Sequence, residues 1–315
     1  MNKLLYKYPL GAFLSAIILL SVNIASASAN EGYEYSFDPV PEKIAQYTRN
    51  TATTYLNEGL QLIQRGRAQD AINAFKQAIQ LDPSLAPAYY NLGLALRQVG
   101  ELQPSADAFY RATQVDPKFA LAYANLGGAL LEGNNLDQAQ NYLQRSLELD
   151  SKLGVAHYNI GLLHQQKENC RKAVKSFRKA MKYSNKAPEP AYQIGLCYMQ
   201  QRKFKRAKTA FNQAIKINPK YPEAHYNVGS ILYTQGKHEQ ALEAFRKAAE
   251  ADPDYPSAYY GAGLAFIQMK QFPDAMRVLQ YARDLFLAQN NSQWAKNAEL
   301  LMQQAQSFTG SIPPR

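Results

Sequence analysis

The sequence has few of the residues that usually build catalytic or metal sites. Its 315 residues include two cysteines, four histidines and one tryptophan. His157 and His164 lie seven residues apart on one helical face, but they do not belong to a recognised metal-ligand motif. Packing roles are favoured for both histidines, and no metal site is predicted.

Nucleotide-binding and strand-forming patterns are also missing. Gly261, Ala262 and Gly263 begin like a dinucleotide-binding motif, but Phe266 stands where the third glycine belongs and no strand precedes it. Long β-branched runs are absent, whereas Ala, Leu, Gln and Tyr are abundant, which favours helices. The sequence therefore predicts an all-α protein without a cofactor.

The first 29 residues have the order of a secretory signal peptide. Lys3 and Lys7 precede an uncharged stretch that ends in small residues at Ala27 and Ala29. An uncleaved membrane anchor is the alternative, and the short apolar core makes it less favoured. We expect cleavage after Ala29 and an exported chain, periplasmic or extracellular. No cysteine follows the apolar run, so a lipoprotein is not expected.

The rest of the chain repeats with a period of 34 residues. One glycine column comprises Gly59, Gly93, Gly127, Gly161, Gly195, Gly229 and Gly263. Parallel columns hold small residues such as Ala71 and Ala78, and aromatic or leucine side chains such as Phe75. A proline column, Pro83, Pro117, Pro219 and Pro253, is expected to end one helix before the next begins. Each repeat reads as two antiparallel helices.

These columns resemble the tetratricopeptide repeat, which has the same period. The resemblance covers Ala52 to Gln289 and predicts seven repeats, at 52–85, 86–119, 120–153, 154–187, 188–221, 222–255 and 256–289. It implies an α-solenoid, a right-handed superhelix of helix-turn-helix units. Ser151, Asn185 and Leu287 stand in place of the proline in the other three repeats.

Flanking segments are predicted at both ends of the array. Residues 30–51 form a linker and a lead-in helix that starts at Pro41. Residues 290–308 form a capping helix, and 309–315 form a tail. The apolar stripe of the cap comprises Trp294, Ala298, Leu301, Ala305 and Phe308.

The first helix of each repeat is expected to line a concave face, where a carboxamide recurs. These residues are Asn57, Asn91, Asn125, Asn159, Gln193 and Asn227. A ladder of such groups can bind the backbone of an extended peptide. Similar ladders occur in the repeat-bearing glycosyltransferases and motor-cargo adaptors. The alternative is that each side chain bonds within its own helical pair.

Tyrosines stand one residue before the carboxamide at Tyr90, Tyr158, Tyr192 and Tyr226, and Tyr260 holds the same place in the last repeat, where Gly261 replaces the carboxamide. On the concave face they would supply rigid contact surface for a partner. The neighbouring column, Tyr89, Tyr123, His157, His225 and Tyr259, is assigned to the core. The carboxylate clamp of the chaperone-tail subfamily lacks its Lys and Arg residues here, which disfavours an acidic C-terminal tail as the ligand.

Positive charge is concentrated in repeats four and five. The chain carries +10, and the segment from Lys167 to Lys220 has fifteen Lys or Arg against two Glu. An outward basic patch is predicted, comprising Arg171, Lys175, Arg178, Lys182, Lys205, Lys208 and Lys216. It would contact an anionic membrane or envelope polymer, or simply form a solvated face. Nucleic acid is disfavoured because the chain is expected to be exported.

Cys170 and Cys197 lie in adjacent repeats that the fold brings together. A disulfide is one interpretation, and a pair of buried free thiols is slightly favoured. The repeats and cap occupy the mature chain, so no catalytic domain is expected. The predicted function is a non-catalytic scaffold in the cell envelope that binds a protein segment during assembly of an envelope or membrane complex. The alternative is a peripheral binder of anionic membrane or polymer.

Overall fold

The computed structural model describes residues 42–309, and this range forms fifteen helices. The expected signal peptide, the linker up to residue 41 and residues 310–315 lie outside it. The helices are α1 (Glu42–Gln64), α2 (Ala68–Leu81), α3 (Ala86–Gln98), α4 (Leu102–Val115), α5 (Ala120–Glu132), α6 (Leu136–Leu149), α7 (Gly154–Gln166), α8 (Cys170–Tyr183), α9 (Glu189–Gln200), α10 (Phe204–Ile217), α11 (Pro222–Thr234), α12 (His238–Ala251), α13 (Pro256–Gln268), α14 (Phe272–Ala288) and α15 (Ser292–Thr309).

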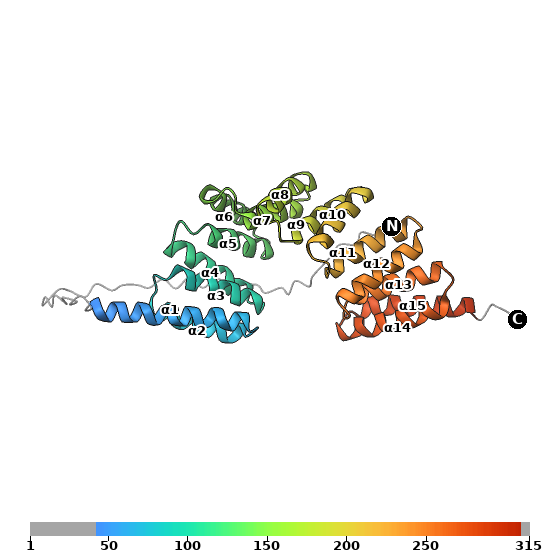
Figure 1. Cartoon of the computed structure of the whole chain (residues 1–315), viewed down its shortest axis with the longest axis horizontal. Coiled ribbons are helices and arrows are strands. Elements are labelled where there is room, and N and C mark those ends of the chain that lie inside the picture. Colours follow the sequence, from blue (N-terminus) through green and yellow to red (C-terminus); the bar gives the residue numbers. More distant parts are fainter. Residues whose placement is uncertain (1–41, 310–315) are drawn as a thin grey trace, which may run out of the picture. The chain divides into compact units, whose positions relative to one another are not determined.

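Consecutive helices pack in pairs, and each pair packs on the next (Figure 1). Three pairs of neighbouring odd-numbered helices, α5 with α7, α11 with α13 and α13 with α15, also contact each other directly. Within residues 42–309, neighbouring even-numbered helices make no comparable contact. The odd-numbered helices are therefore the more closely spaced layer. We call the surface formed by their exposed side chains the odd-helix face.

Glycine allows the two helices of a pair to approach closely. A Cβ built on Gly93 in α3 would lie 2.7 Å from two ring carbons of Phe109 in α4. The Phe109 ring is fully buried and fills the space that the missing side chain leaves. Leu143 does the same against Gly127, so the glycine and the large residue are matched in every such pair.

Aspartate follows four of the even-numbered helices, α2, α4, α6 and α12, whether or not a proline comes next. Oδ1 of Asp82, Asp116 and Asp150 accepts a hydrogen bond at 2.9 Å from the backbone N–H two residues later. Helix α6 therefore ends at Leu149 although Ser151 replaces the proline. In the last repeat Phe286 takes the place of the aspartate and is buried beside Trp294, at 5.9 Å between ring centroids. Helix α14 accordingly continues to Ala288.

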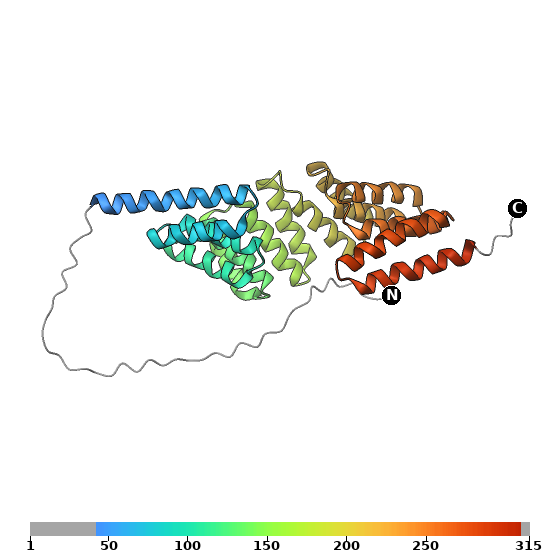
Figure 2. The ribbon, with the colours of Figure 1, turned by 90° about the horizontal axis from the view of Figure 1, so that it is seen from below.

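Both ends of the array differ from its middle. At the C-terminal end, α15 packs on α14, and Trp294 contacts Tyr260 at 5.3 Å between ring centroids. At the N-terminal end, the lead-in and the first repeat helix form one continuous helix of 23 residues, α1, drawn in blue in Figure 2. None of the helices in residues 42–309 is both long and apolar enough to cross a membrane.

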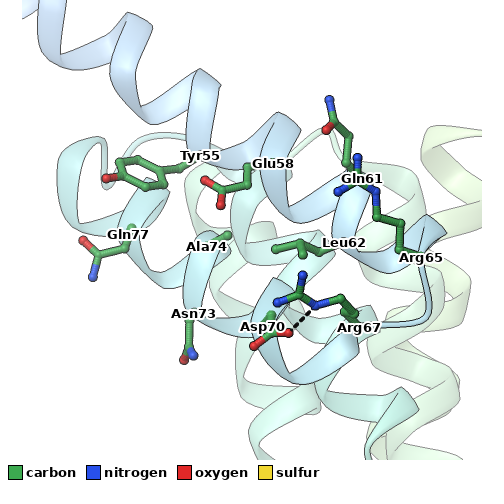
Figure 3. Close-up of a pocket in the computed structure, with 10 residues that line it drawn as sticks. All are labelled: Tyr55, Glu58, Gln61, Leu62, Arg65, Arg67, Asp70, Asn73, Ala74 and Gln77. Carbon is green, nitrogen blue, oxygen red and sulfur yellow. Dashed lines mark hydrogen bonds and ion pairs between the residues drawn. The ribbon is translucent and has the colours of Figure 1, made fainter.

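The open side of the first repeat is polar. Glu58 and Gln61 occupy the places where the next repeat has the buried Leu92 and Ala95. They line a cavity of about 430 Å³ between α1 and α2, where Arg67 and Asp70 form an ion pair at 2.6 Å (Figure 3). No earlier repeat covers this surface in the described residues, so polar side chains there need no burial.

Candidate functional site

The tyrosines of the odd-helix face are half-buried and join consecutive repeats. Four of them pack on the phenylalanine of their own helical pair, as Tyr192 does on Phe211 at 5.5 Å between centroids, and Tyr260 packs on Phe286. Tyr192 also packs on Tyr221, which lies before the next odd helix, at 5.1 Å. Tyr90 makes the same two contacts, with Phe109 and Phe119. One side of each ring is therefore structural, and only the remaining surface can meet a partner.

The predicted carboxamides donate hydrogen bonds within the protein. Nδ2 of Asn125 donates to Tyr90 Oη at 3.3 Å and to Leu121 O at 3.0 Å. Asn227 repeats this pattern with Tyr192 and Glu223. Asn91 donates to the carbonyl four residues earlier, and Asn57 is exposed. The tyrosine and carboxamide columns thus form linked pairs 35 residues apart.

Burial and these hydrogen bonds shift the pKa values of the tyrosine hydroxyls in opposite directions. Burial raises the pKa of Tyr90 above its usual value, and the hydrogen bond from Asn125 partly opposes that rise. Burial likewise raises the pKa of Tyr158, opposed by a hydrogen bond with Gln193. These phenols remain protonated at neutral pH and act as hydrogen-bonding groups rather than as bases.

Asn159 is the most internal of the carboxamides in its bonding. It is 6 % exposed, and Nδ2 donates to Ala124 O of α5 at 2.9 Å. A Cβ on Gly128 would lie 2.9 Å from this nitrogen, so the glycine makes room for the amide. At this step the carboxamide fastens α7 to α5 of the preceding repeat, so its bond runs between repeats rather than within its own helical pair.

A column of leucines on the odd-helix face was missed by the sequence analysis. These residues directly follow the repeat glycine and comprise Leu60, Leu94, Leu162, Leu196 and Leu264, with Gly128 and Ser230 in the other repeats. Leu60 and Leu94 are 37 % and 36 % exposed, and Leu121 on the same face is 38 % exposed. The same 34-residue alignment could have found them.

An apolar cavity of about 220 Å³ opens between repeats four and five. Its lining includes Val155, Tyr158 and Pro190, with Glu189 contributing a carboxylate. Gly154 stands at its edge, where a Cβ would collide with the side chain of Ser184. The cavity thus depends on a glycine at a position that holds alanine or proline in the other repeats.

The column assigned to the core has the expected packing role. His157 is 5 % and His225 9 % exposed, and the Nε2 of each lies 2.9–3.0 Å from a backbone oxygen. Burial lowers the pKa of His157, so its ring is held neutral. The tyrosines of this column, such as Tyr259, are half-buried against neighbouring rings. No metal-ligating cluster is present in residues 42–309.

The predicted basic patch lies on the even-numbered helices α8 and α10. Its side chains are exposed except Lys208, which is half-buried. Of these residues, Arg178 lines a cavity of about 530 Å³ together with Arg206, which the sequence analysis did not select. The patch therefore contains a hollow with two guanidinium groups.

The two cysteines are free, buried and in one apolar cluster. Cys170 Sγ donates to Gln200 Oε1 at 2.9 Å. Burial, with a contribution from the neighbouring Cys170, raises the pKa of Cys197 well above its usual value. The thiol of Cys197 is therefore unreactive as a nucleophile in the folded protein.

Solved structures with the same fold share low sequence identity with this chain. The APC/C hetero-tetramer Cut9-Hcn1 aligns with a TM-score of 0.62 and 18 % identity over 71 % of this chain and 46 % of that one. Yeast Tom70 aligns with 0.60 and 18 % over 84 % and 56 %. PilF of Pseudomonas aeruginosa aligns with 0.57 and 18 % over 67 % and 96 %. The chain thus matches only about half the length of the first two.

Family models described as tetratricopeptide repeat or TPR repeat match residues 59–100, 86–119, 120–153, 155–186, 192–256 and 232–296. A search of curated proteins gave no match. The matched segments span the helical pairs α1 to α14, and proteins built from these repeats are generally scaffolds for protein–protein interaction. The chain belongs to the tetratricopeptide-repeat family and forms an all-α solenoid of that type.

Proposed function

We propose that this protein is a non-catalytic adaptor that binds an extended segment of a partner protein on its odd-helix face. The observation that carries the proposal is the leucine column, in which Leu60 and Leu94 are more than one third exposed and the leucines of the later repeats are half-buried. Apolar side chains that recur on one surface favour a ligand that runs along the repeats.

The other groups on this face suit an extended polypeptide. Within the described residues the amide nitrogens of Asn125 and Asn227 are engaged, so their Oδ1 atoms remain to accept partner N–H groups. The 220 Å³ cavity beside Tyr158 has the size of a single side chain. Backbone recognition by the carboxamides and side-chain recognition by the cavity would act together.

We also propose that the adaptor works in the cell envelope, in the assembly of an envelope or membrane complex. The support is the signal-like order of residues 1–29. Cell fractionation followed by N-terminal sequencing tests it. A mature chain beginning at Asn30 outside the cytoplasm agrees with the proposal, whereas an unprocessed cytoplasmic chain contradicts it.

Binding is tested by affinity capture from an envelope extract with two variants. Leu60→Asp/Leu94→Asp places charge on the odd-helix face. The control is Leu102→Asp, because Leu102 is 42 % exposed at the start of the even-numbered helix α4. Circular dichroism checks folding. We expect the first variant to lose a partner that the control keeps. Equal capture by both variants would place the binding surface elsewhere.

A further inference from the structure

Two even-numbered helices of the array contain cations and no acidic residue. Helix α8 has six Lys or Arg and α10 has four, and neither contains Asp or Glu. Every other even-numbered helix has at least one Asp or Glu. Like charges at this density repel one another unless an anion is bound. This surface therefore differs from α6, α12 and α14, where arginines pair with carboxylates of the same helix.

The cavity between these helices gathers groups that bind an oxyanion. Arg178 from α8 and Arg206 from α10 line it, together with Gln213 and the aromatic ring of Tyr198 from α9. Met181, Ile194 and Ala210 supply apolar lining. A volume of about 530 Å³ accommodates a phosphate group with part of the molecule that carries it.

Tyr198 positions one of the two guanidinium groups. Nη2 of Arg178 donates to Tyr198 Oη at 3.1 Å. The phenol oxygen accepts this bond, so its own proton is free to point at an anion. Holding the guanidinium in place also reduces the side-chain entropy that anion binding would otherwise cost.

The equivalent positions two repeats later hold a different set of charged groups. Arg246, which corresponds to Arg178, is paired with Glu243 and Glu250 at 2.8 Å and 2.7 Å. Asp274 replaces Arg206 and pairs with Arg277 at 2.7 Å, and Phe266 replaces Tyr198. There the protein supplies its own anions, whereas among the described residues no carboxylate pairs with Arg178 or Arg206.

We propose that the cavity of Arg178, Tyr198 and Arg206 is a binding site for a phosphate group, carried either by a small soluble molecule or by a lipid headgroup. Two guanidinium groups match the charge of a phosphate monoester and can each bind two of its oxygens. The site lies on the even-numbered helices, so it leaves the odd-helix face free for a protein segment. The proposal is independent of that binding function.

The test measures affinity for inorganic phosphate and pyrophosphate by calorimetry at constant ionic strength. A parallel arm measures co-sedimentation with phosphatidylcholine vesicles that contain phosphatidic acid. The variants are Arg178→Gln, Arg206→Gln and Tyr198→Phe. Lys216→Gln removes the same charge from α10 outside the cavity, and Arg246→Gln removes it from the ion-paired location. Circular dichroism checks that all variants fold.

We expect Arg178→Gln and Arg206→Gln to weaken binding about tenfold or more, and Tyr198→Phe by a smaller factor. Lys216→Gln and Arg246→Gln should stay close to wild type. Binding of the soluble anions identifies a soluble ligand, and binding of vesicles alone identifies a headgroup. Equal weakening by Lys216→Gln and Arg206→Gln would show a diffuse charge effect and overturn the proposal. Absence of binding in both arms would overturn it as well.

Discussion

Replacing Gly93 by alanine tests the glycine-to-ring packing on which each repeat depends. The new Cβ would lie 2.7 Å from Cδ1 and Cε1 of Phe109, about 1 Å closer than carbon atoms normally pack. Phe109 is fully buried, so its ring cannot move into solvent. Overpacking of this kind costs about 1–3 kcal/mol, whereas the change from glycine to alanine within a helix contributes about 1 kcal/mol. A 2.7 Å contact with a ring that cannot move belongs in the upper part of the overpacking range, so we expect a net destabilisation of about 1–2 kcal/mol.

A matched control separates the clash from the helix propensity. Gly133 ends α5, and its Cβ would lie 3.7 Å from the nearest atoms, an ordinary contact. Gly133→Ala should therefore be neutral or stabilising by up to about 1 kcal/mol. Urea denaturation followed by circular dichroism gives the overall stability, and hydrogen exchange of α3 and α4 shows whether the loss is local, as expected for a repeat array.

The second test is a double-mutant cycle with Phe109→Ala. Removing the ring removes the obstacle, so Gly93→Ala should cost nothing or be stabilising in that background. A Gly93→Ala protein as stable as wild type would refute the packing argument. An undiminished cost in the Phe109→Ala background would refute it too.

Three further predictions follow from buried polar groups. Asn159→Ala should destabilise the protein by about 1 kcal/mol through loss of the bond to Ala124 O, and Asn159→Asp by more, because a buried carboxylate would face that carbonyl; thermal unfolding measures both. Burial should raise the pKa of the introduced carboxyl group, so the Asn159→Asp variant should regain stability as pH falls. Cys197, whose thiol pKa is raised by burial, should be alkylated slowly at pH 8 in the native state and rapidly in urea, as mass spectrometry can follow. Burial lowers the pKa of His157 in the folded protein. The buried neutral ring therefore stabilises the protein fully above the unfolded pKa of about 6.5, and this stabilisation is lost as the pH falls below about 6.5. The variant His157→Gln should show a weaker pH dependence of unfolding in this range.

Much of the architecture could be predicted because the same pattern of small and large apolar residues recurs in all seven repeats. A glycine such as Gly93 and a large residue such as Phe109 recur at fixed offsets, and neither column has another physical explanation. Helix ends were attributed to the proline column, but α6 ends at Leu149 without a proline, where Asp150 forms an Asx turn. That signal was present in the sequence but was masked by the neighbouring prolines.

The candidate sites were less predictable because periodicity shows that residues share a face, but not which groups they contact. The tyrosine and carboxamide columns were both visible, yet their pairing across 35 residues, as in Tyr90 with Asn125, depends on how one odd helix lies beside the next. The exposed Leu94 was overlooked because a leucine beside a repeat glycine is usually assigned to the core. Arg206 was overlooked because helical spacing shows which residues of one helix share a face. It does not show that Arg206 of α10 and Arg178 of α8 line the same cavity.

The sequence by itself determined the helical pairs, their number and the concentration of positive charge in repeats four and five, because these properties depend on local spacing and composition. Tertiary structure alone decided which polar groups are engaged and which remain available. Hydrogen bonds such as that of Asn159 with Ala124, and the hollow shared by Arg178 and Arg206, arise between helices of different repeats. Such contacts depend on the packing distance between helices, which a glycine or a single side chain sets and which no periodic pattern specifies.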